Sequence, residues 1–531
     1  MFSNIHFKML PAKTPFPNIL KNHRFLFLGT SSLTFGLVIL LLKSWIIEVL
    51  TASVIVLQPN NALEGFWRKT PVDLPTNVYF FNWTNPEAIH DFKIKPQFEE
   101  VGPYKFKQKL EKVNIVWNDN NTVTYNQMRT FSYDNEEENG DLSDMITSIN
   151  AVTLACAHYI QNWNYFLKRG ASMVFSAVYP TVDTTRSANQ LLLEGYDDII
   201  VDIAKMLPFI ASEIPRFDKF GWLFILNGTS AFEGAINMDD GEMGNFEIRQ
   251  WNYESKLTQF TGSCAELGRS SAGELYPHTI KREYIEVFIP QFCRNLRFDY
   301  VGNVTVDGIS GYKFAIGAGV LDNGTLIPEN KCYCAGKCIP SGVFNISSCR
   351  YGLPTYGSLP HFYGADQYYL ENVEGLQPRE DKHQSYIILE PTTGAPIEAA
   401  LRIQLNMYLH PIDSIMVYED VPELYFPLLW VETSASLPHY MKILLKIYLI
   451  SPQIMLGASL ALTLLGLYML LFIAYKPFFV SFYKHLHRKK RNQPVKSEEV
   501  PLRCDVEIAF ANCAIENDEW EKPLVNKFTL R

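Results

Sequence analysis

The chain has 531 residues, of which 47 are lysine or arginine and 56 are aspartate or glutamate, and its formal net charge at pH 7 is -9. A chain of this length holds one large domain or roughly two to three smaller ones. The charge balance has none of the basic character that marks a nucleic-acid-binding protein, so we expect no nucleic-acid partner.

Two long apolar runs without charged residues lie near the ends of the chain. The first, Phe25–Leu42, approaches the length that a helix rising about 1.5 Å per residue needs to cross a bilayer core of about 30 Å. A cleaved signal peptide is the alternative, but the run is longer than a typical signal core and no clear cleavage site follows. We therefore expect an uncleaved transmembrane helix over residues 25–45. The second run, Ile447–Tyr475, predicts another over residues 447–475.

Basic residues predict the orientation of these two helices. The cluster after the second run consists of Lys484, His485, His487, Arg488, Lys489, Lys490 and Arg491. The N-terminal tail has no acidic residue and carries Lys8, Lys13, Lys21 and Arg24. Lysine and arginine concentrate on the cytoplasmic side of membrane proteins. We therefore expect both tails, residues 1–24 and 476–531, in the cytoplasm and residues 46–446 on the other side as an ectodomain.

Sequons for N-glycosylation agree with this topology. All of them lie between the two apolar runs, at Asn82, Asn120, Asn227, Asn303, Asn323 and Asn345. Glycan attachment requires exposure to the secretory pathway, so the distribution indicates a glycosylated ectodomain.

Strand signals dominate the first part of this ectodomain. Val78–Trp83 reads as one strand, and Val113–Trp117 with Thr122–Tyr125 predicts a hairpin around the turn residues 118–121.

Residues 141–212 differ from this pattern and predict a helical insertion. Clean alternation is missing, and the runs Thr153–Lys168 and Ala188–Leu207 have helical character. We expect Lys168 and Arg169 to end one of these helices, where cations suit the helix dipole.

Strand signals then return at Tyr284–Ile289, Asn303–Val306 and Tyr312–Ile316. The clearest is Leu401–Leu409, whose aliphatic and polar residues alternate, and we expect it to pair with Ser385–Glu390. Many such strands in one block favour a closed or nearly closed antiparallel sheet, which can enclose a cavity.

Six of the nine cysteines lie between Cys264 and Cys349, and four of these fall in the stretch Cys332–Cys349. A metal site would need a reducing compartment and typically Cys-x-x-Cys pairs or histidines, and the stretch has neither. The sequon at Asn345 lies inside it. We therefore expect disulfides and no metal site. Cys156 is expected to be a buried free thiol, whereas Cys504 and Cys513 should stay reduced in the tail.

Motifs for catalysis are missing from the sequence. It contains no Gly-x-Ser-x-Gly, His-Glu-x-x-His or P-loop pattern. Gly317-Ala318-Gly319 begins like a dinucleotide fingerprint, but Asp322 stands where the third glycine belongs. We therefore expect no enzymatic activity, no catalytic residues and no cofactor.

Several short stretches together carry a family resemblance. They are Asn82-Trp83-Thr84-Asn85-Pro86, Glu100-Val101-Gly102-Pro103-Tyr104, Thr130-Phe131-Ser132-Tyr133-Asp134, Gly195-Tyr196-Asp197-Asp198, Leu359-Pro360-His361-Phe362 and Leu389-Glu390-Pro391. With the cysteine order and the two apolar runs, they resemble the class B scavenger receptor family. That family includes the fatty-acid translocase, the lysosomal integral membrane proteins and the insect sensory neuron membrane proteins.

The resemblance implies an α+β fold. This fold is a two-span membrane hairpin whose ectodomain is an antiparallel β-barrel with an apolar tunnel and a helical apex, here residues 141–212. The family's disulfide order implies the pairs Cys264–Cys332, Cys293–Cys349 and Cys334–Cys338. The last pair departs from the family because the gap between its cysteines is shorter than in relatives.

The resemblance also implies a role for Lys168 and Arg169. At the apex of family members, basic residues receive fatty-acid carboxylates or anionic lipoproteins, and these two match by position. Ordinary helix-terminal charge is the alternative interpretation.

Three functions are compatible with this resemblance. The first is a receptor that binds lipids, namely fatty acids, sterols, carotenoids or lipoproteins, and passes them to the membrane. The second is a lysosomal or endosomal protein that sorts a soluble partner held at the apex. The third is an adhesion or pathogen-recognition receptor. The acidic sorting pattern Glu498–Leu502 is broken by Arg503, which favours the cell membrane over the lysosome.

Overall fold

The structure is a computed structural model that describes residues 16–134, 140–206, 218–317, 319–334, 336–349 and 352–491. Most of both predicted tails lies outside the described residues, and so do Cys504 and Cys513. The chain divides into two compact units. One comprises the described parts of residues 1–37 and 461–531, and the other comprises residues 38–460.

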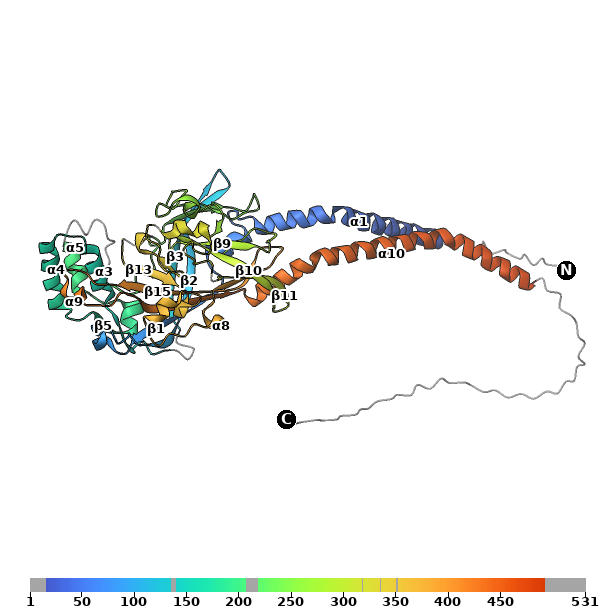
Figure 1. The fold of residues 1–531 in the computed structure, drawn as a ribbon. Helices are drawn as coiled ribbons and strands as arrows, with labels where there is room; N and C mark the ends of the chain where they lie inside the picture. Colours follow the sequence, from blue (N-terminus) through green and yellow to red (C-terminus); the bar gives the residue numbers. More distant parts are fainter. Residues whose placement is uncertain are drawn as a thin grey trace, which may run out of the picture. The chain divides into compact units, whose positions relative to one another are not determined.

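The first unit consists of parts of two long helices, α1 (Phe16–Ile55) and α10 (His439–Arg491). Residues 23–49 and 439–483 of these helices are long and apolar enough to cross a membrane. Within this unit the helices lie side by side (Figure 1) and meet at small residues. A Cβ on Gly466 would lie 2.5 Å from the backbone nitrogen of Leu33 and 2.7 Å from the carbonyl oxygen of Gly29. Ser32 Oγ donates a 2.9 Å hydrogen bond to the Leu462 carbonyl. Small residues let membrane helices pack this closely.

The second unit is built on a sheet of 14 strands. Its strands are β1 (Leu74–Trp83), β2 (Phe98–Asn118), β3 (Thr122–Tyr133), β6 (Ala235–Asp239), β7 (Ile248–Trp251), β8 (Ser270–Ser271), β9 (Tyr284–Ile289), β10 (Arg294–Val306), β11 (Ile309–Ala315), β12 (Val343–Asn345), β13 (Thr355–Ser358), β14 (Tyr386–Leu389), β15 (Pro396–Leu409) and β16 (Leu424–Ser436).

The sheet closes on itself. Its main path runs β7-β6-β3-β2-β1-β16-β15-β14-β11-β10-β9-β8, and β12 and β13 branch from β15. All the paired strands are antiparallel except β8 and β9. Glu247, beside β7, forms an isolated bridge with Ser271 of β8, which joins the two ends of the path. The predicted α+β fold with an antiparallel β-barrel is confirmed.

Strand alternation separates the two faces of this barrel. On β2, Tyr104, Phe106, Gln108 and Leu110 are buried, whereas the alternate side chains between them are more exposed. The buried face continues on neighbouring strands, where Val78 lies opposite Tyr104 and also opposite Val431. The expected pairing of Leu401–Leu409 with Ser385–Glu390 is confirmed by the ladder between β14 and β15.

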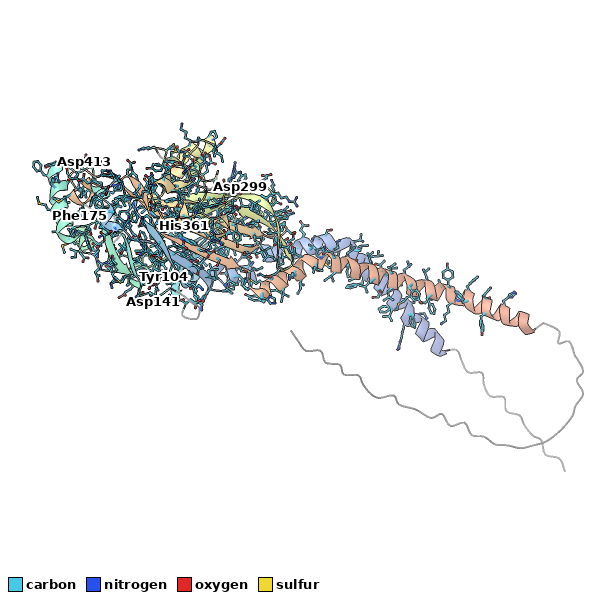
Figure 2. The ribbon with its side chains drawn as sticks, turned by 60° about the horizontal axis from the view of Figure 1, so that its bottom comes forward. Tyr104, Asp141, Phe175, Asp299, His361 and Asp413 are labelled. Atoms are coloured by element: carbon cyan, nitrogen blue, oxygen red, sulfur yellow. A yellow bond between two sulfur atoms is a disulfide. The ribbon has the colours of Figure 1, made fainter. Side chains whose placement is uncertain are left out.

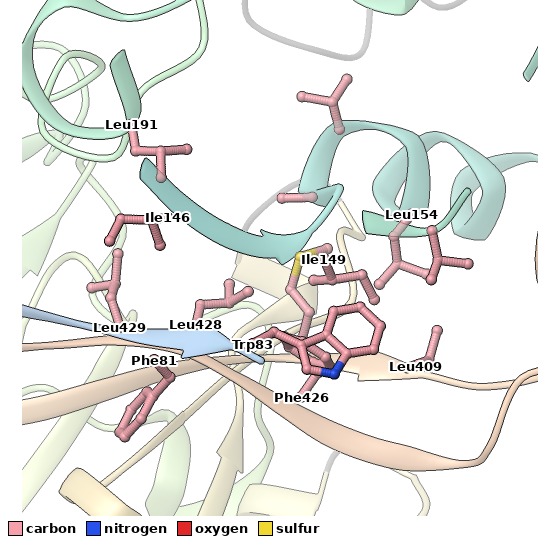
Figure 3. Packing of buried hydrophobic residues seen from close by; sticks show 14 of the residues in the cluster. Phe81, Trp83, Ile146, Ile149, Leu154, Leu191, Leu409, Phe426, Leu428 and Leu429 are labelled. Carbon is pink, nitrogen blue, oxygen red and sulfur yellow. The ribbon is translucent and has the colours of Figure 1, made fainter. Parts of the chain in front are cut away.

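Short helices gather at one end of the barrel (Figure 1). They are α3 (Ala151–Ile160), α4 (Tyr165–Val178), α5 (Ile199–Met206) and α9 (Met416–Glu419), accompanied by the small sheet of β4 (Met145–Ile149) and β5 (Asp183–Ser187). Figure 3 shows how this layer packs on the barrel: Ile146 of β4 lies over Leu428 and Leu429 of β16, and Leu154 of α3 lies over Leu409 of β15. Burying each such side chain stabilises the fold by about 1.5–3 kcal/mol.

The predicted helix boundaries in this region are wrong. The run Thr153–Lys168 is two helices, because the Asn164 side chain accepts the Leu167 amide and begins α4 there. The run Ala188–Leu207 is a short π-helix (Gln190–Glu194) followed by α5. Gly195 separates them with a φ of 68°, a value that glycine adopts readily. Leu207 lies outside the described residues.

The remaining elements are short. They are α2 (Ala62–Arg68), α7 (Gln367–Glu371), α8 (Glu380–His383) and the 3-10 turns η1 (Pro86–Ala88), η3 (Gly262–Ala265), η4 (Pro328–Cys334), η5 (Ser347–Cys349) and η6 (Pro360–Phe362).

Three disulfides connect the loops around β8 to β12. The Cα–Cα distances are 5.8 Å for Cys264–Cys332, 6.0 Å for Cys293–Cys349 and 4.7 Å for Cys334–Cys338, all within the span that a disulfide can bridge. Cys156 has no disulfide partner, and burial raises the pKa of its thiol to about 12, which makes it unreactive.

The Cys293–Cys349 bridge generates a test. Losing a disulfide from a secreted fold costs about 2–5 kcal/mol, so Cys293→Ser and Cys349→Ser should each reduce export from the endoplasmic reticulum. Because both remove the same bridge, their effects should be equal, and the double variant should be no worse than either single one. Glycan maturation in a pulse-chase measures export. Additive effects, or a full-length chain with both thiols free, would contradict the pairing.

Candidate functional site

The two cations predicted to receive ligands lie near the start of α4. Lys168 and Arg169 are its fourth and fifth residues, so their expected place at the end of a helix is wrong. The break before Asn164, which the helical pattern does not reveal, is the reason. Cations are unfavourable near the positive end of a helix dipole unless anions compensate them.

Arg169 has such a compensating anion, whereas the described part of the chain places none against Lys168. Arg169 donates to Glu419 of α9 at 2.9 Å, and its guanidinium lies 5.8 Å from the centre of the Tyr165 ring. The neighbouring Met416 amide donates to Ser172 Oγ, which fixes α9 against α4. Among the described residues, Lys168 has no ion-pair partner. Its charge is therefore the one available to a ligand.

Exposed apolar side chains surround this lysine in sequence. Tyr165, one helical turn before Lys168 on the same side of α4, is 57 % exposed, and the adjacent Leu167 is 55 % exposed. We call the set Tyr165, Leu167 and Lys168 the apex patch. Exposed apolar groups beside an uncompensated cation form a surface suited to an anionic amphiphile.

A second polar cluster lies in the body of the barrel, where Figure 2 labels His361, apart from the helical end marked by Phe175 and Asp413. Glu100 of β2, His361 of η6 and His383 of α8 bring ligand-type atoms within 4.8 Å of one another. The Glu100 carboxylate accepts from His361 Nε2 at 2.5 Å and from Trp430 Nε1 at 2.8 Å. The two imidazole rings stack with centres 4.4 Å apart.

The hydrogen bonds of these rings do not suit a metal ion. Nδ1 of His361 accepts the Gln377 amide at 3.0 Å, and Nδ1 of His383 accepts the Arg379 amide at 2.9 Å. A neutral imidazole that accepts through Nδ1 carries its proton on Nε2 and has no lone pair left for a metal there. Metal-binding histidines show the reverse arrangement, because they donate through the second nitrogen. The cluster is therefore a hydrogen-bonded anchor that fixes residues 359–384 to the barrel wall.

Comparison with known proteins identifies the family of the chain. The sequence model of the CD36 family matches residues 27–476. The chain belongs to the CD36 family. Relatives include Protein peste of Drosophila melanogaster, 36% identical over 388 residues (71% of this chain and 68% of that protein). Scavenger receptor class B member 1 of Bos taurus is 27% identical over 417 residues (77% and 80%). Lysosome membrane protein 2 of Homo sapiens is 29% identical over 388 residues (71% and 78%).

Membership of the CD36 family, together with the two long apolar helices, makes this a membrane protein. It also confirms the resemblance to class B scavenger receptors. Two of the stretches that carried the resemblance meet in space, because Glu100 and His361 are 261 positions apart in sequence and bonded to each other. Their presence in shared stretches was the available signal for this anchor, but the sequence does not show that they touch.

The electrostatics of the anchor favour a charged Glu100 and a neutral His383. Burial alone would raise the pKa of Glu100, but hydrogen bonds from His361 and Trp430 bring it below its ordinary value. Burial, with a contribution from His361, lowers the pKa of His383 to about 4. Near the helical end, burial and the neighbouring His410 lower the pKa of His158 to about 4 in the same way.

These shifts predict acid sensitivity of this CD36-family fold. Below the ordinary histidine pKa of about 6.5, the unfolded chain binds protons that the folded chain excludes. Stability should therefore fall as the pH drops from about 6.5 to 4, at up to roughly 1.4 kcal/mol per pH unit for each histidine. His383→Asn keeps an acceptor for the Arg379 amide but cannot titrate, so it should flatten this dependence.

Thermal unfolding of the full chain in detergent between pH 4 and 7 measures the effect. His158→Asn is the matched comparison, because it removes the other shifted histidine and should contribute independently. An unchanged pH slope in both variants would assign the acid sensitivity to other groups.

Proposed function

We propose that this protein is a cell-surface receptor that captures lipids at the apex patch and passes them through the barrel interior to the bilayer. The observation that carries the proposal is the position of Lys168 among exposed apolar side chains, while Arg169 is compensated by Glu419. A lipid with an anionic head and an apolar chain matches both components of this surface. The relative named scavenger receptor class B member 1 supports a receptor role.

The interior of the barrel supports the transfer step. Buried aromatic and aliphatic side chains of six strands, including Leu296, Phe298, Phe314, Ile387 and Ile403, form one apolar cluster. A small apolar cavity also lies between the barrel strands and the helical end, lined by Phe80, Leu428, Ile149, Leu191 and Trp222 among others. We place the start of the lipid route at this cavity.

The energetics of such transfer require no chemical step. A lipid leaving water for the bilayer gains about 0.8 kcal/mol for each buried CH₂ group. The barrier lies in crossing the water layer and the headgroups, and an apolar path lowers it because the chain stays out of water. We therefore infer a passive receptor with no cofactor and no catalytic residue.

A second candidate is a sorting receptor of the lysosomal or endosomal membrane, with the apex patch holding a soluble protein. The relative named Lysosome membrane protein 2 favours it. Surface biotinylation and co-localisation with a lysosomal marker separate the two candidates. The first candidate requires the chain at the cell surface, and the second requires it at the lysosomal or endosomal membrane.

The membrane topology proposed for this receptor can be tested through its glycans. Asn120, Asn227 and Asn303 are exposed, and Asn82, Asn323 and Asn345 are partly buried. We expect enzymatic deglycosylation to lower the apparent mass, and a sequon engineered into either tail to remain unmodified. Glycan on a tail sequon, or none on the six natural ones, would overturn the hairpin topology.

The role of Lys168 generates the functional test. Lys168→Glu should reduce uptake of labelled fatty acid by about three- to fivefold, since an exposed ion pair contributes about 0–1 kcal/mol and charge reversal also adds repulsion. Uptake of a labelled sterol ester, which carries no charge, should stay unchanged. The measurement is cellular uptake normalised to surface receptor.

Two further variants complete this test. Lys93→Glu makes the same charge change at an exposed lysine outside the apex patch and should leave fatty-acid uptake unaltered. The triple variant Lys168→Glu/Arg169→Glu/Glu419→Arg reverses both cations but restores the ion pair between positions 169 and 419. It should lower fatty-acid uptake little more than Lys168→Glu alone does. Equal loss of fatty acid and sterol ester would indicate a shared docking step, and unchanged uptake of both would remove Lys168 from the entrance.

A further inference from the structure

Charged side chains meet inside the barrel, far from the apex patch. The side chain of Lys112 on β2 is fully buried, and its ammonium donates to Glu274, in the segment that follows β8. Because β3, β6 and β7 separate β2 from β8 along the sheet, this contact crosses the interior. Arg129 on β3 pairs with Glu233, in the segment before the neighbouring strand β6.

The Glu233 carboxylate is fully paired by side chains of the protein. Glu233 accepts from Arg129, from Gln127 Nε2 at 3.1 Å and from Gln291 Nε2 at 2.5 Å. The charges of Lys112 and Arg129 balance those of Glu233 and Glu274. A further charged group would therefore disturb a cluster of four side chains whose charges already cancel.

The other carboxylate is incompletely paired. Within the part of the chain that the structure describes, Glu274 Oε2 is buried and accepts no hydrogen bond, and the indole N–H of Trp67 donates none. Trp67 is only 4 % exposed, and the Lys112 ammonium lies 5.9 Å from the centre of its ring. Buried polar atoms are almost always paired. The carboxylate with the unpaired acceptor and the ring with the unpaired donor therefore both lie near the Lys112 ammonium, which has more N–H groups than its bond to Glu274 uses.

We propose that Lys112, Glu274 and Trp67 bind the hydroxyl group of an uncharged lipid inside the barrel. A hydroxyl oxygen accepts from the ammonium or the indole, and its O–H donates to Glu274 Oε2. A carboxylate would add charge and has no proton for Glu274, and an ether or ester also lacks the donor. Apolar neighbours of Trp67, including Tyr125 at 4.9 Å between ring centres, suit the hydrocarbon part.

This inference rests on the proposed lipid-binding function, and a matched pair of ligands tests it. Cetyl alcohol and its methyl ether differ only in the hydroxyl proton and a methyl group. The full-length chain, purified in detergent, should bind the alcohol at least about tenfold more tightly, because a buried site built for a hydroxyl rejects an analogue that leaves its polar groups unpaired. Displacement of a fluorescent alcohol measures both affinities.

Variants assign the preference to the three residues. Lys112→Met/Glu274→Met should bind alcohol and ether equally while still binding fatty acid. Lys107→Met/Asp134→Leu is the matched control, because it removes a 2.9 Å ion pair from the opposite face of β2 and should keep the preference. Trp67→Phe keeps an aromatic ring but removes the indole N–H, and it should weaken the preference for the alcohol over the ether. This variant keeps the test available if the double variant does not fold.

The outcomes separate this site from the proposed function. Equal affinities of the unaltered chain for the alcohol and the ether would show that water, not a lipid hydroxyl, pairs with Glu274 and Trp67. A preference for the alcohol that survives all the interior variants would place the hydroxyl site elsewhere. Either result overturns this site alone. A chain that binds neither the alcohol, the ether nor fatty acid would overturn the lipid-receptor proposal itself.

Discussion

The antiparallel pairing of β1 with β16 is the constraint on which the rest of the structure depends. These are the first and last strands of the barrel sheet, and Thr76 lies opposite Thr433 while Phe80 lies opposite Leu429. Because the strands run in opposite directions, the start of β1 and the end of β16 lie at the same end of the pair. The chain therefore enters and leaves the barrel at the same end. Such an arrangement is needed because one membrane helix precedes the barrel in the sequence and another follows it.

Local patterns located two of the strands correctly. Tyr284–Ile289 has the same bounds in sequence and structure, and the alternating run Leu401–Leu409 lies within β15. The expectation that this run has one buried face is wrong, because its polar residues Gln404 and Asn406 are fully buried as well. Strand β16 was missed. Leu424–Trp430 are all buried, so no alternation remains there. The helical end was located correctly but divided wrongly, since a cap at Asn164 interrupts a run that composition alone would continue.

The polar sites were less accessible from sequence because their partners are distant. Lys168 and Arg169 are adjacent in sequence, yet only the fold places Glu419 against Arg169 and, among the residues that the structure describes, no anion against Lys168. Lys112 sits in a strand among other lysines, and nothing local shows that its side chain faces inward. Burial of a long polar residue depends on a partner, which here is Glu274. Such pairs are properties of the closed barrel rather than of any one segment.

The closure of the barrel has a mechanical consequence. Neighbouring strands along the main path share ladders of two or more residue pairs, whereas among the described residues the single bridge Glu247–Ser271 joins its two ends. Separating these ends breaks fewer backbone contacts than parting any ladder, so the circumference of the barrel is easiest to change at this seam. The chain itself connects β7 to β8 across this seam through residues 252–269, and this covalent connection limits how far the two ends can separate. A change of circumference at the seam would therefore leave the strand order intact.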